Sequence, residues 1–172
     1  KDINFRVKCD SLGIISEDYY KDNIVLENAE AFKGFFDITT DDPDIISRLY
    51  NYCNGDEGDA LEAFIDLCKE KIGRKPYANE YFCVKSGSAS FIGRWEQEKI
   101  EKVATPKDFC EEFQRLSVSP RNREQLYAFN SLLDTSLPMV TISGLAGSGK
   151  TFIALMSAYA LVQAGYYDRI VF

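Results

Sequence analysis

The chain contains no histidine among its 172 residues. This absence excludes Ser-His-Asp catalysis and histidine-containing zinc sites within the segment. No run of about eighteen apolar residues is present, so we expect no membrane span. Residues 1–6 lack both the apolar core of a signal peptide and an initiator methionine. They are typical of the interior of a longer protein, and we expect the chain to be an interior fragment.

The cysteines are few, widely spaced and without a C-x-x-C pair: Cys9, Cys53, Cys68, Cys83 and Cys110. An odd number without a secretory signal favours reduced, mostly buried thiols in a cytoplasmic protein. The net charge of −7 argues against a surface devoted to nucleic acid, although it permits a local basic groove. The apolar fraction of 45% is enough for packed cores.

Apolar spacing predicts the elements of the first half. Residues 4–12 are expected to form a helix and residues 23–26 an extended stretch. Pro43 favours a helix start, with apolar residues up to Cys53 on one face. Residues 61–72 repeat that helical spacing.

Residues 77–100 are predicted to form a small β module. Two β-rich runs, 80–85 and 90–95, flank Ser86-Gly-Ser88 and indicate a hairpin. Its aromatic side chains fit either a hairpin core, the commoner role, or a platform for stacking on single-stranded bases. They are Tyr81, Phe82, Phe91 and Trp95.

The last third predicts the beginning of a parallel α/β sheet. A helix follows residues 120–122, and residues 137–143 are typical of a buried strand. A glycine-rich loop, a helix over 151–163 and a second strand over 169–172 complete the series. The order strand, loop, helix, strand is characteristic of this fold class.

The loop Gly144-Leu-Ala-Gly-Ser-Gly-Lys-Thr151 matches the P-loop pattern in full. Its glycines permit backbone conformations that point N–H groups at phosphates. Lys150 supplies a cation for the β and γ oxygens, and the Thr151 hydroxyl is suited to Mg²⁺. The expected site comprises Gly144, Leu145, Ala146, Gly147, Ser148, Gly149, Lys150 and Thr151, of which Lys150 and Thr151 are also the expected catalytic residues.

Asn122 and Gln125 lie shortly before this loop and are candidate nucleotide contacts. A glutamine amide can donate to one adenine nitrogen and accept from the adenine amino group, which favours ATP over GTP. The alternative for Gln125 is a solvated residue at a helix start.

Three segments together resemble the ATPase domain of the PhoH family: 120–125, 133–134 and 139–151. That family is similar in core architecture to superfamily 1 helicases, in which a glutamine in this place contacts the base. Further segments resemble the connecting region of longer PhoH proteins and the end of their N-terminal PIN nuclease domain. They are 79–82 with 93–95, and 1–6 with Asp10 and 12–14.

The resemblance implies three parts. Residues 1–40 are the tail of a PIN-like α/β domain, 41–118 a linker with helices and the β module, and 119–172 the start of a P-loop ATPase domain. The implied whole protein is a cytoplasmic, RNA-directed ATPase or helicase fused to a ribonuclease. Ring assembly among PhoH relatives implies a homo-oligomer.

Asp2 matches the late acidic position of PIN nucleases, and Asp10 is a second candidate metal ligand. A helix N-cap is an equally good explanation of Asp2. The earlier PIN carboxylates and the Walker B acid are expected outside the chain, so neither nuclease activity nor appreciable ATP hydrolysis is expected from this segment alone.

Three other functions stay open from the residues. A P-loop nucleotide or small-molecule kinase needs a lid and an acceptor pocket after the loop. A switch-type GTP-binding module is disfavoured by Gln125. The last alternative is a non-catalytic interaction fragment.

Overall fold

The computed structural model describes residues 9, 11–13, 32–56 and 58–171. The chain divides into two units, 1–33 and 34–172, and every element below belongs to the second. Most of the predicted helix at 4–12 and the whole predicted stretch at 23–26 lie outside the described residues. None of the described helices combines the length and apolarity that a bilayer span requires.

Two of the helices predicted from apolar spacing in the first half are confirmed. They are α2 (Ile45–Cys53) and α3 (Ala60–Ile72). Helix α3 ends at Gly73, whose φ of 72° is in the left-handed region that glycine adopts without a Cβ penalty. Ile45 and Leu49 on α2 and Phe64 on α3 are buried, so the apolar faces of the two helices meet one core.

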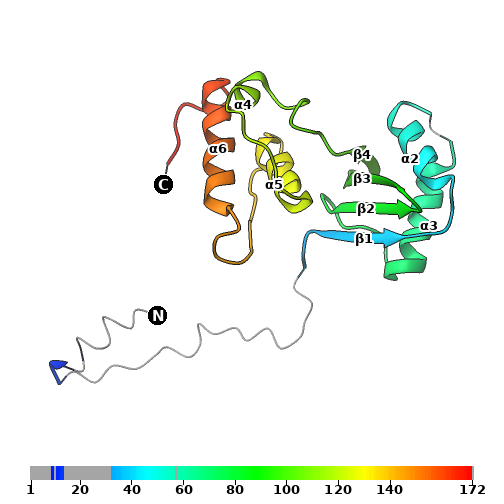
Figure 1. Cartoon of the computed structure of the whole chain (residues 1–172), viewed down its shortest axis with the longest axis horizontal. Coiled ribbons are helices and arrows are strands. Elements are labelled where there is room, and N and C mark those ends of the chain that lie inside the picture. Colours follow the sequence, from blue (N-terminus) through cyan, green and yellow to red (C-terminus); the bar gives the residue numbers. More distant parts are fainter. Residues whose placement is uncertain (1–8, 10, 14–31, 57, 172) are drawn as a thin grey trace. The chain divides into compact units, whose positions relative to one another are not determined.

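A four-stranded mixed sheet forms the centre of the unit (Figure 1). Its strands are β1 (Phe35–Thr39), β2 (Tyr81–Ser86), β3 (Ala89–Glu96) and β4 (Lys99–Lys102), in that order. The predicted β2–β3 hairpin is confirmed, and β4 extends it antiparallel. Strand β1 pairs parallel with β2, and α2 and α3 supply the crossover that a parallel pair needs. Residues 35–39 are therefore a strand of this sheet. From the sequence they were expected to belong to the PIN-like segment 1–40.

Strand β2 is buried on both faces. Phe82 and Val84 pack with Leu49 and Phe64 in the core beneath α2 and α3. Tyr81 points to the other face and packs against Tyr127. The four aromatic residues of the module are at most 5% exposed, which confirms the hairpin-core interpretation and leaves them unavailable for stacking on bases.

Three helices lie on the opposite side of the sheet from α2 and α3 (Figure 1). They are α4 (Glu111–Arg115), α5 (Arg123–Leu133) and α6 (Lys150–Gln163), and the last two confirm predicted helices. A second core joins them, built from Phe109, Phe113, Phe129, Ile153 and Ala160. Helix α5 thus lies between the sheet and α6.

The two predicted strands beside the glycine loop are not formed within the described residues. Segments 137–143 and 169–171 form no β-strand. A strand exists only when its backbone groups bond to a neighbouring strand, and apolar sequence alone does not supply that neighbour. The predicted strand–loop–helix–strand unit is therefore present only as loop and helix.

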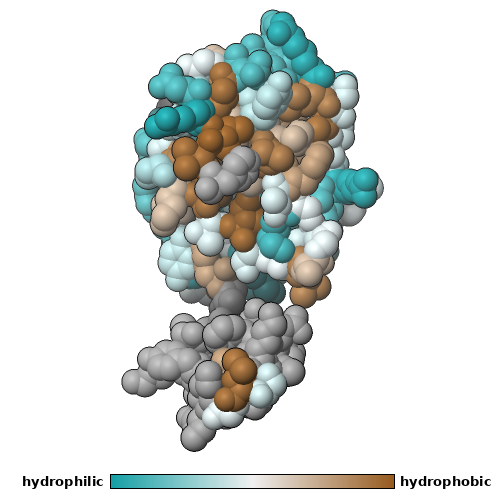
Figure 2. Space-filling model, turned by 90° about the vertical axis from the view of Figure 1, so that its left-hand side faces the viewer, coloured by the Kyte–Doolittle hydropathy of each residue, from teal (hydrophilic) through white to brown (hydrophobic). Residues whose placement is uncertain are grey.

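The segments 137–143 and 169–171 border a hollow of about 320 Å³ against α6. Met139, Val140, Ala158 and Ile170 contribute to its walls. Figure 2, which faces this side of the molecule, shows hydrophobic residues gathered over it. Helix α6 is apolar around most of its circumference, and this face has no covering layer among the described residues.

Candidate nucleotide-binding site

The glycine loop runs directly into the first residue of α6. Gly147 and Gly149 have φ angles of 79° and 88°, in the left-handed region. A side chain with a Cβ is strained in that conformation, so glycine is required at these two positions. The loop residues 144–148 are exposed to solvent. The glycines of the sequence pattern thus stand where the backbone adopts conformations that other residues disfavour.

The Lys150 ammonium lies over the loop. Its Nζ donates to the carbonyl oxygens of Gly144 at 2.9 Å and Leu145 at 2.7 Å, with a longer contact of 3.4 Å to the Ser148 hydroxyl. All three acceptors are neutral, so none of these contacts cancels the positive charge. An anion that enters the loop could replace these neutral acceptors as the hydrogen-bond partner of the Lys150 ammonium. The hydrogen bond would be stronger, because both groups would then be charged.

The N-terminus of α6 is a second feature that favours an anion at the loop. Gly149 is the N-cap and no acidic residue lies in the first turn. The first N–H groups of a helix have no acceptor within it, and the helix dipole is positive at this end. Thr151 is exposed in this first turn, where its hydroxyl is accessible to a metal ion bound with the phosphates. Together these groups suit a phosphate chain.

Gln125 lies against the same loop. Its Nε2 donates to the Ser148 carbonyl at 3.2 Å, and its Oε1 accepts from the Arg121 N–H at 2.8 Å. A Cβ built at Gly149 would lie 3.4 Å from that Nε2. The structure therefore brings this predicted residue to the glycine loop and holds its amide in a defined orientation.

Asn122 has a capping role. It is the N-cap of α5, and its Oδ1 accepts from the Gln125 N–H at 2.9 Å. One of its side-chain groups is thus already used in starting the helix. A contact between Asn122 and a nucleotide stays a prediction.

An ion pair that no sequence pattern indicated lies in the same helical turn as Gln125. Arg123 Nη1 and Nη2 donate to the two carboxylate oxygens of Asp37 at 2.7 and 2.9 Å. These hydrogen bonds lower the pKa of Asp37, outweighing the opposing effect of its partial burial. The partners are 86 positions apart, so no local pattern signals the pair.

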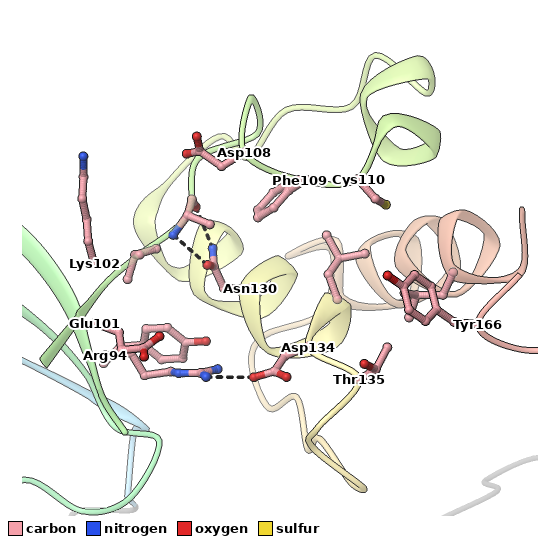
Figure 3. Close-up of a pocket in the computed structure, with 15 residues that line it drawn as sticks. Arg94, Glu101, Lys102, Asp108, Phe109, Cys110, Asn130, Asp134, Thr135 and Tyr166 are labelled. Atoms are coloured by element: carbon pink, nitrogen blue, oxygen red, sulfur yellow. Dashed lines mark hydrogen bonds and ion pairs between the residues drawn. The ribbon is translucent and has the colours of Figure 1, made fainter. Parts of the chain in front are cut away.

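A second hollow, of about 340 Å³, lies between the sheet, the segment 103–110 and helices α5 and α6 (Figure 3). Its polar groups are largely engaged. Arg94 pairs with Asp134 at 2.8 Å and with Glu96. Asn130 accepts from the N–H of Ala104 and donates to its carbonyl. These contacts tie α5 to the sheet and to the segment after β4.

The remaining predicted ligands are not placed. Asp2 and Asp10 lie outside the described residues. Within 32–56 and 58–171, no group of three or more carboxylate, thiol or imidazole side chains is arranged to hold a metal ion. All five cysteines are free, and burial raises the pKa of Cys68 to about 12.

Fold and loop define an α/β protein with a glycine-rich loop suited to phosphate. The chain is 30% identical, over 177 aligned positions, to Protein PhoH2 of Bacillus subtilis (strain 168). The similarity covers 99% of this chain. The chain spans 36% of the length of that relative. No protein-family model and no solved structure matches it.

Proposed function

We propose that this chain is the nucleotide-binding part of a PhoH-like ATPase and binds ATP with Mg²⁺ through residues 144–151. The observation that carries the proposal is the Lys150 ammonium, held over a loop with two left-handed glycines at the start of α6. The similarity to PhoH2 supports the ATPase class.

Each group has a role that its position allows. The loop N–H groups and the first turn of α6 bind the phosphate oxygens. Lys150 turns from the loop carbonyls to the β and γ oxygens, and the Thr151 hydroxyl ligates the metal ion. Bound Mg²⁺ neutralises charge on the triphosphate.

Gln125 would read the base. An amide group offers two N–H donors and two acceptor positions on oxygen. Ser148 and Arg121 use one of each, so one donor and one acceptor are left for the adenine edge. This arrangement favours ATP over GTP, because guanine presents a carbonyl where adenine has an amino group.

For the whole protein we propose a cytoplasmic, RNA-directed ATPase or helicase fused to a PIN ribonuclease, assembled as a homo-oligomer. These finer features rest on the resemblance of 79–95 and 1–14 to longer PhoH proteins. Asp2 and Asp10 would be metal ligands of the nuclease domain.

Nucleotide binding is tested by competition. A fluorescent ATP analogue with Mg²⁺ is displaced by ATP or GTP, on this chain and on the full-length protein. We expect ATP to compete better than GTP and Lys150→Ala to abolish binding. Lys107→Ala removes an exposed cation away from the loop and should leave binding unchanged. If the full-length protein binds no ATP, or if both lysine variants weaken binding equally, the proposal fails.

A further inference from the structure

One face of α5 is fastened to the sheet along its whole length. Arg123, Tyr127, Ser131 and Asp134 are spaced so that they lie on one side of a helix. Tyr127 stacks on Tyr81 with ring centroids 4.6 Å apart. The remaining contacts of this face are Ser131 with the Tyr81 hydroxyl at 2.8 Å, Asp134 with Arg94 at 2.8 Å, and Arg123 with Asp37.

Gln125 projects from the other side of the same helix. With about 100° of rotation per residue, a residue two positions after Arg123 lies roughly opposite the fastened face. There its amide reaches the Ser148 carbonyl of the glycine loop. Helix α5 is therefore a spacer between the β sheet on one side and the nucleotide site on the other.

The Arg123–Asp37 pair is the sheet contact of the first turn of α5. Tyr127 and Ser131 fasten later turns of the helix. Both oxygens of Asp37 and two guanidinium nitrogens of Arg123 take part, a geometry that restrains rotation as well as distance. The first turn of a helix frays most easily, so a restraint here matters most for a side chain at its start.

We infer that Asp37 and Arg123 are positioning residues for recognition of the nucleotide base: strand β1 holds the first turn of α5 so that the Gln125 amide meets adenine. The inference rests on the proposed function. It also assigns a role to the β sheet, which lies outside the phosphate loop, in the selectivity of the site.

A merely structural pair predicts a different result. If Asp37 only stabilised the fold, its loss would lower the affinity for all ligands of the loop equally, or for none of them. A positioning pair affects the base contact alone. Inorganic tripolyphosphate, which has no base, separates the two possibilities, because it uses the loop, Lys150 and the metal ion but not Gln125.

The test compares Asp37→Asn with Asp42→Asn in the full-length protein. Asp42 pairs with Arg48 at 2.5 Å, so its variant also removes an Asp–Arg pair of the same unit, but one that does not touch α5. Affinities for ATP, GTP and tripolyphosphate are measured with Mg²⁺. We expect Asp37→Asn to lower the affinity for ATP about fivefold, which corresponds to the free energy of one well-formed, partly exposed ion pair. The affinity for tripolyphosphate should change less than about twofold. Asp42→Asn should change none of the three.

A charge-swapped variant, Asp37→Arg with Arg123→Asp, should restore part of the ATP preference. The inference is overturned if Asp37→Asn leaves the ATP:GTP ratio unchanged, or if it weakens tripolyphosphate as much as ATP. That result, with ATP binding still dependent on Lys150, leaves the proposed function intact. If the unmodified protein binds neither ATP nor tripolyphosphate, both the proposed function and this inference fail.

Discussion

The side-chain amide of Gln125 donates a hydrogen bond to the backbone carbonyl of Ser148, 3.2 Å away, and so joins the start of α5 to the glycine loop. The amide oxygen is held from the other direction by the Arg121 N–H. Two contacts fix an otherwise flexible side chain at the edge of the site. The predictions below follow from this arrangement and from the packing that supports it.

Replacing Gln125 should remove base selectivity while leaving phosphate binding. Gln125→Ala deletes the amide, and we expect ATP affinity to fall about tenfold with little change for GTP, because a two-bond base contact is worth about 1–3 kcal/mol. Competition binding with both nucleotides measures the ratio. Gln163→Ala, at the exposed end of α6, is the matched control. An unchanged ratio in Gln125→Ala would assign this residue only to tying α5 to the loop.

Gly93 on β3 has no room for a side chain. A Cβ there would lie 2.5 Å from Phe82 Cζ and 2.7 Å from Phe91 Cε1, both in the buried core. We expect Gly93→Ala to lower the free energy of unfolding by about 1–3 kcal/mol through overpacking. Urea denaturation measures the change. Gly58→Ala, whose Cβ meets only the Asp56 side chain at 3.6 Å, should be close to neutral.

The carboxylate of Glu80 is 2% exposed and is held by Arg74 through hydrogen bonds of 2.7 and 2.8 Å. It also accepts from the Tyr77 N–H at 2.8 Å. Arg74→Met would leave a buried charge without its cation, and we expect a loss of about 3 kcal/mol in unfolding free energy. Arg115→Met breaks an exposed pair with Glu111 and should cost well under about 1 kcal/mol. Equal effects of the two variants would contradict this account.

The Arg123–Asp37 pair should make stability depend on pH in the acid range. Hydrogen bonds from Arg123 lower the pKa of Asp37 in the folded protein. A group with a lowered folded pKa contributes stability above its unfolded value of about 3.9, and this contribution is lost as pH falls through the folded pKa. Because both side chains are partly exposed, we expect less than about 1 kcal/mol.

Urea midpoints of the unmodified protein and of Asp37→Asn at pH 7 and at pH 2–3 test this dependence. The difference between the two proteins should be present at pH 7 and shrink in acid. A difference that stays constant or grows in acid would show that Asp37 does not act through its charge.

Local patterns were sufficient for much of this chain. Helical spacing located α2, α3 and α5, and the turn between two β-rich runs located the β2–β3 hairpin. These elements depend on residues near one another in sequence, which periodicity can report. The same is true of the glycine loop, whose two left-handed positions are glycines at 147 and 149.

Contacts between distant segments could not be read in this way. The parallel pairing of β1 with β2 places Phe35 beside Tyr81, and no sequence pattern near Phe35 predicts this pairing. Segment 137–143 shows the converse error, because its apolar composition predicts a strand for which the described residues offer no partner. Strand formation depends on a neighbour as much as on the strand itself.

The sequence by itself determined the chemistry of the loop: the glycines, the lysine and the threonine that a phosphate chain and its metal ion require. Tertiary structure decided what surrounds that chemistry. It placed Gln125 beside Ser148 and fastened Arg123 to Asp37 across 86 positions. Loop conformation follows from local backbone sterics, whereas these contacts exist only after the sheet and α5 have packed together.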